Sequence, residues 1–225
     1  MFTGFLSKPG TITARRAVIR MGILAASLVF LVFAGLTLAG DRDEGRDGRG
    51  HYASGTVLGP NAEIRDFSLA DAAHATAVYN TGGTTLPHLP FQLVNGTATV
   101  EAGKPLYVPV FFADDSPPIA VLPFPNDIDD EDVAADYLIQ SIDAFIGLTD
   151  VAATFIEVDG KVTILSDEYT VGVKSEPLAD GGGTHYIVSG VFLAPLKSGV
   201  HKIAVGAVLT DGTNVGPPAY TITVP

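Results

Sequence analysis

Residues 184–210 decide the fold, and they read THYIVSGVFLAPLKSGVHKIAVGAVLT. Two apolar runs, 186–193 and 200–209, flank a short connector that contains Pro195 and Gly199. In the second run the large apolar residues fall at every other position, which is the period of a half-buried strand. Proline has no N–H to donate and glycine tolerates positive φ, so we expect the chain to turn in the connector. The stretch predicts an antiparallel strand pair joined by a long arch.

The chain from residue 149 onward is dense in strand signals. The apolar or alternating runs occupy residues 151–158, 161–165, 168–173 and 219–224. Asp159-Gly160 is a hairpin-turn signal between the first two runs. Strands that recur about every ten residues, with turn residues between them, are typical of a β-sandwich. The sequence therefore predicts a mainly β fold.

Shorter strand signals precede this region. Residues 91–94 and 97–101 flank Asn95-Gly96, the dipeptide favoured in two-residue hairpin turns, so they predict a hairpin. Residues 106–113 are largely apolar and predict a strand that is buried on both faces. Pro109 within that run indicates an edge strand or a bulge, because it cannot donate to a ladder.

The pattern at residues 131–146 predicts a helix inserted among the strands. Asp129 or Asp130 suits the N-cap, and Gly147 suits the C-cap. Apolar spacing at i, i+3 and i+4 defines one face. The residues expected on that face are Ala134, Tyr137, Leu138, Ser141, Ile142 and Phe145. A weaker signal upstream predicts one or two helical turns at 68–75 and a short strand at 76–79.

The N-terminal 40 residues predict export. A positively charged region precedes the apolar block 21–40, which ends in small residues and is followed by a charged run. This order is typical of a cleaved signal, here with Ala39 before the cut. The block is also close to the length that spans a bilayer, so a retained membrane anchor is the alternative. In both cases the bulk of the chain is expected outside the cytoplasm.

The remaining chain is expected to form a linker and one domain. Residues 41–55 are charged and glycine-rich, which predicts a flexible linker. Residues 56–225 are long enough for a single β-sandwich domain held by its core alone, since the chain has no cysteine. The formal net charge is −12, and residues 1–40 hold four of the 13 basic residues and no acidic one. So acidic a surface repels nucleic acid and anionic lipid.

Four pieces of the chain carry a resemblance to a known family. They are residues 96–110, the helix after the acidic loop, residues 158–161, and residues 192–203 with the pattern Pro-Leu-x-x-Gly-x-His-x-Ile. Together they resemble an uncharacterised family of secreted bacterial proteins with an Ig-like β-sandwich. The resemblance implies export and an Ig-like antiparallel β-sandwich with one inserted helix. It implies no activity.

An acidic run before the predicted helix is the candidate metal site. Its alternate carboxylates match the first ligands of a calcium loop. However, Asp132 stands where that loop needs glycine and Leu138 where it needs glutamate, so an EF-hand is excluded. A looser calcium site is an alternative to helix capping and solvation. Its candidate ligands are Asp114, Asp115, Asp127, Asp129 and Glu131.

The histidines show no metal-binding spacing. They are His51, His74, His88, His185 and His201. We expect the ring of His201 to pack partly and to hydrogen-bond the backbone of the turn beside Gly199. The sequence contains no Gly-x-Ser-x-Gly, His-Glu-x-x-His or P-loop motif.

These observations predict an exported, non-enzymatic β-sandwich that acts as an interaction or structural module at the cell surface. Its expected partner is an extracellular protein or glycan, with no cofactor. Two alternatives stay open. One is a metal-dependent hydrolase with a site in the acidic loops 114–132. The other is a carbohydrate-binding module, which predicts exposed tyrosines clustered on one sheet face.

Overall fold

The computed structural model describes residues 52–80, 88–115, 122–174 and 183–225. The predicted signal or anchor at 1–40 and all but the end of the predicted linker at 41–55 lie outside these ranges. Within them, no helix is long and apolar enough to cross a membrane.

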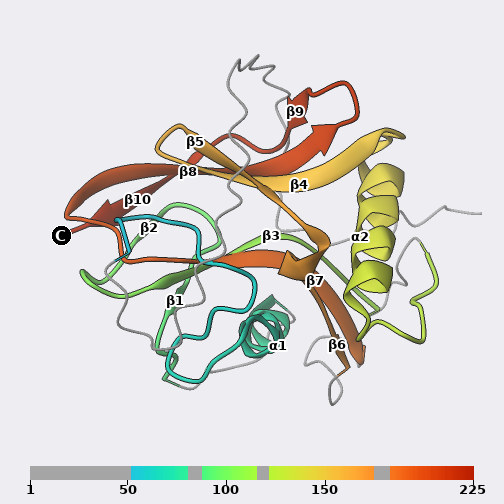
Figure 1. Ribbon diagram of the computed structural model, residues 1–225, viewed down its shortest axis with the longest axis horizontal. Helices are drawn as coiled ribbons and strands as arrows, with labels where there is room; N and C mark the ends of the chain where they lie inside the picture. The colour runs from blue at the N-terminus through green and yellow to red at the C-terminus, as the bar shows by residue number, and fades with distance from the viewer. Residues whose placement is uncertain (1–51, 81–87, 116–121, 175–182) are drawn as a thin grey trace, which may run out of the picture.

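Two packed sheets and two α-helices make up the described fold (Figure 1). The first sheet has the order β1 (Gln92–Leu93), β3 (Leu106–Asp114), β7 (His185–Leu193), β6 (Thr170–Lys174). The second sheet has the order β2 (Ala98–Thr99), β10 (Tyr220–Val224), β8 (Gly199–Leu209), β4 (Val151–Val158), β5 (Lys161–Leu165), and β9 (Asn214–Val215) also pairs with β8. A 3₁₀ turn, η1, spans Asp167–Tyr169. The predicted mainly β fold is confirmed.

The predicted antiparallel pairing of the runs 186–193 and 200–209 is wrong. The two runs form β7 and β8, which lie in different sheets, and the connector crosses between the sheets. β7 pairs with β3 and β6, whereas β8 pairs with β4, β9 and β10. All residues of β7 after His185 are buried, because the second sheet covers one face of this strand and α1 (Leu69–Asn80) covers the other (Figure 1).

The helix α1 replaces the strand predicted at 76–79. Ser68 and Asp71 cap its start reciprocally, since Ser68 N donates to Asp71 Oδ2 over 2.9 Å and Asp71 N donates to Ser68 Oγ over 3.3 Å. Ala73 and Ala77 are fully buried against the first sheet. Their small side chains let the helix lie close to the strands, so tertiary packing overrides the weak local strand signal.

A tyrosine on β3 joins α1 to the first sheet. The ring of Tyr107 lies across Gly190 of β7, where a Cβ would come within 2.4 Å of the tyrosine oxygen. The hydroxyl of Tyr107 reaches the side chain of Thr76 on α1. Thr76 Oγ1 in turn donates to Ala72 O over 2.7 Å. Burial raises the pKa of Tyr107, so the phenol stays neutral and hydrogen-bonded inside the core.

The hairpin predicted around Asn95-Gly96 is also wrong. Its two short strands, β1 and β2, lie in different sheets, and they pair parallel to β3 and β10 respectively. The sandwich is therefore not antiparallel throughout. The side chain of Gln92 links the two segments, because its Nε2 donates to Thr99 O over 3.2 Å and its Oε1 accepts from Glu101 N over 3.1 Å. This stretch thus ties the two sheets together at one edge.

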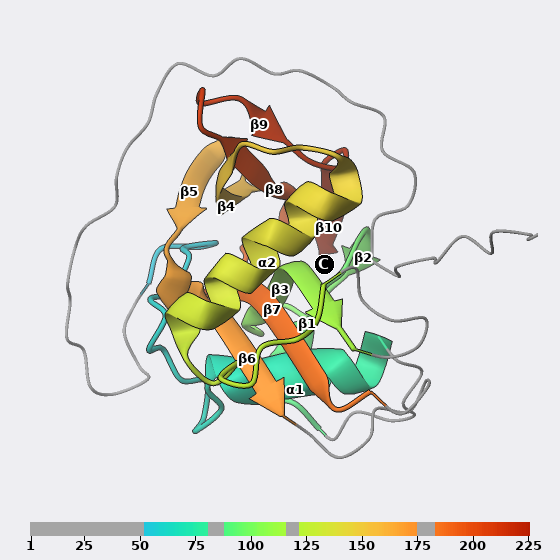
Figure 2. The same ribbon diagram turned by 90° about the vertical axis from the view of Figure 1, so that its right-hand side faces the viewer.

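The second helix, α2 (Glu131–Ile146), confirms its prediction at both ends. Asp130 is the N-cap and accepts from Asp132 N and Val133 N, and Gly147 adopts the left-handed conformation with φ 69°. α2 crosses the open side between the sheets (Figure 2) and contacts β3, β4, β6 and β7. Phe145 was expected on its apolar face but is 39% exposed, since the buried face ends at Ile142.

Two details of the strands complete the core. The register of β3 shifts between Pro109 and Phe111, so the bulge predicted at the proline is confirmed. Between the sheets, Thr154 Oγ1 of β4 and Ser189 Oγ of β7 lie 3.0 Å apart in a buried hydrogen bond. Apolar side chains of both sheets and of α2 surround this pair in one continuous core.

The contact of Tyr107 with Gly190 generates a stability prediction. We expect Gly190→Ala to lower the free energy of unfolding by about 2–3 kcal/mol, because the added methyl group displaces a buried ring. Gly59→Ala is the matched control, since nothing lies within 4 Å of its Cβ position. Urea unfolding of the full chain measures both changes, and equal losses in the two variants would contradict the role of Tyr107.

Candidate functional site

Three places in the described chain gather chemically active side chains. Two are histidine–carboxylate contacts, and the third is a surface cavity with acidic walls. Each is assembled from segments that lie far apart in the sequence.

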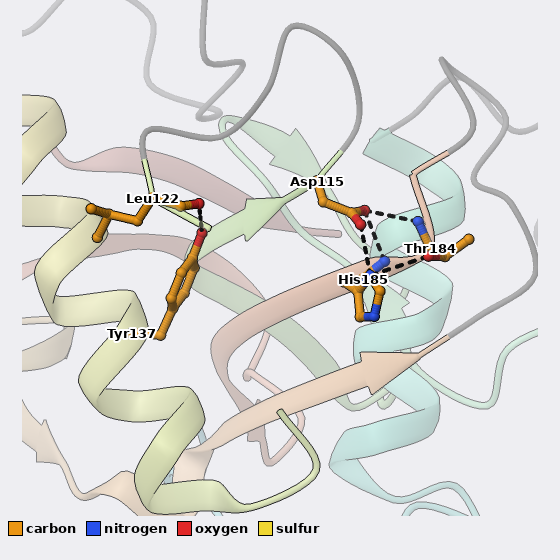
Figure 3. A network of polar contacts seen from close by, with 5 residues as sticks. All are labelled: Asp115, Leu122, Tyr137, Thr184 and His185. Atoms are coloured by element: carbon orange, nitrogen blue, oxygen red, sulfur yellow. Dashed lines mark hydrogen bonds and ion pairs between the residues drawn. The ribbon is translucent and has the colours of Figure 1, made fainter. Parts of the chain in front are cut away.

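The first contact joins the end of β3 to the start of β7 (Figure 3). Asp115 Oδ2 lies 2.6 Å from His185 Nδ1, while Asp115 Oδ1 accepts from Thr184 N over 2.8 Å and from His185 N over 2.9 Å. The backbone continues the β3–β7 ladder here, since Asp115 N donates to His185 O over 3.2 Å. Both oxygens of this carboxylate are therefore engaged by the chain itself.

The geometry of this contact differs from that of a hydrolytic triad. In a triad the carboxylate holds Nδ1 of the histidine and the nucleophile lies at Nε2. Here the hydroxyl of Thr184 lies 3.1 Å from Nδ1, the nitrogen that Asp115 already holds. Thr184 is therefore not placed as a nucleophile that this histidine activates. The contact fixes the ends of two strands.

An aromatic group lies beside this contact. Phe124 packs against Tyr137 with centroids 4.6 Å apart and against the His185 ring at 6.0 Å. Tyr137 Oη donates to Leu122 O over 2.8 Å (Figure 3). Burial raises the pKa of Tyr137, and the negative charge of Asp115 adds to this rise. A neutral phenol that donates to a backbone carbonyl is a structural group.

The second contact lies at the start of β8. His201 Nδ1 lies 2.6 Å from Asp159 Oδ2, and His201 Nε2 lies 2.9 Å from Lys197 O. Asp159 Oδ1 also accepts from Lys202 N over 2.8 Å. The predicted hydrogen bond from His201 to the turn backbone is confirmed, and its side chain is only 14% exposed. Both ring nitrogens face acceptors, so this arrangement favours the doubly protonated imidazolium.

The charges of this contact stabilise each other. The hydrogen bond to Asp159 raises the pKa of His201 against the opposing effect of burial, and the carbonyl of Lys197 adds to the rise. Burial alone would raise the pKa of Asp159, but the bonds from His201 and from the backbone of Lys202 outweigh it and lower that pKa. The pair therefore keeps its opposite charges over a wider pH range than the two side chains would have apart.

The third place is a cavity of about 350 Å³ between the start of α1, the start of α2 and β6. It is lined by Pro60, Asn61, Ala62, Glu63, Ser68, Leu69, Ala70, Asp129, Glu131, Glu168, Thr170, Val171 and Gly172. Asp129 is held at 2.8 Å by Lys174 Nζ, a hydrogen bond that lowers the pKa of Asp129. The other three carboxylates give the cavity a negative wall.

The five predicted calcium ligands are distributed over separate places. Asp129 and Glu131 line the cavity, whereas Asp114, Asp115 and Asp127 are not among its lining residues. Within the described ranges, no group of three or more histidine or acidic residues is arranged to hold a metal ion. Sequence reasoning missed Glu63 and Glu168, because residues 60–63 and 168–172 carry no motif that predicts their meeting.

Within the described ranges, the exposed tyrosines do not lie on a sheet face, where the carbohydrate-binding alternative expects them. In the part of the chain that the structure describes, the exposed tyrosines are Tyr52 and Tyr79, at 54% and 55%. Tyr79 lies on α1, and Tyr52 precedes the first described element. Tyr107 and Tyr186 are buried in the core.

The His201–Asp159 pair predicts a pH-dependent stability. Its contribution is fully present below the unfolded histidine pKa of about 6.5 and is lost as pH rises through the raised pKa of His201. On the acid side it is present above about pH 3.9 and is lost as pH falls through the lowered pKa of Asp159. We expect His201→Gln to cost about 0.5–1 kcal/mol between these limits and less at alkaline pH.

Urea unfolding at pH 5.5 and pH 8.5 measures this difference. The control is His88→Gln, because His88 is exposed. A loss of stability in His201→Gln that is as large at pH 8.5 as at pH 5.5 would rule out the charged pair as its cause.

The occupied carboxylates predict the response to calcium. We expect millimolar calcium to leave Tm of the full chain unchanged, because Asp115 and Asp129 are already hydrogen-bonded within the fold. Thermal unfolding with calcium, and with magnesium as the control, tests this. A rise in Tm that calcium alone produces, and that Glu131→Gln removes, would establish a metal site at the cavity.

Comparisons with protein-family models, with curated proteins and with solved structures find no match for this chain. The resemblance to secreted bacterial Ig-like proteins therefore stays a prediction from the sequence.

Proposed function

We propose that this chain is an exported, non-enzymatic Ig-like β-sandwich that acts as an interaction or structural module outside the cytoplasm. The observation that carries the proposal is the order of the strands in the two sheets. In an immunoglobulin-type domain one sheet has the order A-B-E-D, and the other contains G, F and C, with C′ added in variable-type domains.

The strand order of this chain follows that scheme. In chain order, β1, β3, β6 and β7 take the places of A, B, D and E in the first sheet. The strands β4, β5, β8 and β10 take the places of C, C′, F and G in the second. The helix α2 is then an insertion between B and C. One departure is the parallel pairing of β1 with β3.

The start of β8 offers a second likeness to such domains. Immunoglobulin-type domains often carry a tyrosine near the start of strand F, and its hydroxyl bonds to the backbone a few residues upstream. In this chain His201 lies near the start of β8, and its Nε2 bonds to the carbonyl of Lys197, four residues upstream. At this corner a histidine therefore makes the side-chain-to-backbone hydrogen bond that a tyrosine makes in immunoglobulin-type domains.

The location outside the cytoplasm rests on residues 1–40, whose charge and hydropathy pattern is that of an export signal or anchor. The role in binding rather than turnover rests on the two histidine–carboxylate contacts. Each bonds to neighbouring backbone and supports a strand end or a corner. Immunoglobulin-type sandwiches carry loops clustered at their two ends, and in variable domains the loops of one end bind the partner; here the proposed partner is an extracellular protein or glycan.

Cysteine labelling in intact cells tests the location. The chain has no cysteine, so Gln140→Cys on the exposed side of α2 gives the chain a single thiol. We expect a membrane-impermeant maleimide to label this variant without lysis of the cells. The matched control is the same variant expressed without residues 1–40, which should be labelled only after lysis.

Labelling of the full-length variant only after lysis would reject export. Turnover of any ester, glycan or peptide in a broad substrate panel by the purified full chain would reject the non-enzymatic role.

A further inference from the structure

The outer face of the second sheet lacks a covering helix. This outer face consists of the side chains of β4, β5 and β8 that alternate with core residues. Ile156, Ile203 and Val205 point into the core, so their neighbours along each strand point outward. The helix α1 contacts β3, β6 and β7, and α2 contacts β4 near one side of the sandwich. In Figure 1 neither helix lies over β5, β4 and β8.

The strand register determines the centre of this face. Phe155 pairs with Gly206 and with Ile164, and Glu157 pairs with Ala204 and with Val162. Lys202 precedes Ala204 by two residues, so it lies on the same side of β8. The centre is therefore formed by Phe155, Glu157, Val162, Ile164, Lys202 and Ala204.

Part of this face is covered by the chain itself, and the rest carries apolar side chains. At Gly206 a Cβ would come within 2.3 Å of the backbone oxygen of Val215 and within 2.6 Å of Cε1 of Phe155. Phe155 is only 5% exposed although it points away from the core, so its ring lies beneath the surface that a partner reaches. Val162, Ile164 and Ala204 beside it are half-buried. Further along β8, Val200 has 68% of its surface exposed. The accessible apolar part of the face is thus formed by Val162, Ile164 and Ala204.

The charge of this face differs from that of the chain as a whole. The chain carries 25 acidic and 13 basic residues. The centre of the face carries one of each, Glu157 and Lys202. These two residues are diagonal neighbours, since Ala204 is the direct partner of Glu157. The outer face is therefore nearly neutral although the chain as a whole is acidic. Two copies can meet on this face with little repulsion.

We propose that the outer face of the second sheet binds the same face of a second copy of this chain. A two-fold axis close to Ala204, between the two charges, places Glu157 of each copy opposite Lys202 of the other. A face with one charge of each sign is self-complementary under such an axis, as an isologous interface requires. This inference rests on the proposed function and names the partner of that module.

Crosslinking through a single cysteine tests the contact. In the cysteine-free full chain, Ala204→Cys places a thiol close to the expected axis. Face-to-face sheets pack about 10 Å apart, so a bis-maleimide with a spacer of about that length should join the two copies. We expect about tenfold more covalent dimer than in the Gln140→Cys control, because a bound copy has a far higher effective concentration than a colliding one.

Charge reversal in the Ala204→Cys background tests the pairing. Glu157→Lys or Lys202→Glu alone should reduce the dimer to the level of the Gln140→Cys control, because each creates like charges that face each other. The double variant E157K/K202E should restore the dimer. Equal Tm values across these variants show that the single reversals leave the fold intact.

Two results overturn the inference: a dimer yield for Ala204→Cys no higher than for Gln140→Cys, or a double reversal that restores nothing. These failures are separate from failure of the proposed function. Gln140→Cys is labelled from outside the cell whether or not Ala204→Cys forms a dimer. A labelled surface without a dimer therefore rejects self-association alone.

Discussion

The approach of Tyr107 to Gly190 is the contact on which the arrangement of layers depends. A side chain at position 190 would hold the ring away from β7, and its hydroxyl would then lose Thr76. That bond places α1 on the outside of the first sheet, where it covers β7. A strand that is apolar at nearly every position requires such double cover, since one packed sheet buries only alternate residues. The helix, the glycine and the tyrosine therefore form one unit.

The strands of the second sheet have a different burial pattern. They are buried on the core side, and apart from Glu157 and Lys202 the outer side chains of β4, β5 and β8 are small, apolar or β-branched. The connector between β7 and β8 crosses from one environment to the other, between the almost entirely apolar run of β7 and the alternating run of β8. His201, Asp159 and Lys197 hold the end of that crossing in place. Two neighbouring runs of similar hydropathy thus serve two different layers.

Local chemistry explains what the sequence could predict. The helix α2 was predicted with both ends because Asp130 and Gly147 cap it within one turn, and Asp159-Gly160 likewise fixed the β4–β5 hairpin. Pairing between distant segments has no such signal. The partner of a strand depends on which layer needs it, so the sheet that contains β8 could not be read from residues 184–210. For the same reason Asp115 was singled out, but its partner His185, 70 residues away, was not.

The hydrogen bond between Thr154 and Ser189 has a consequence for how the two sheets are aligned. Apolar side chains tolerate a small slide of one layer over another, because dispersion forces have little direction. Two buried hydroxyls do not tolerate it, since each would lose its partner at a cost of about 1–3 kcal/mol. The sandwich has no disulfide, so this hydrogen bond helps to set how the two sheets are aligned. Many positions of the second sheet relative to the first would bury the same apolar area, and this hydrogen bond favours one of them.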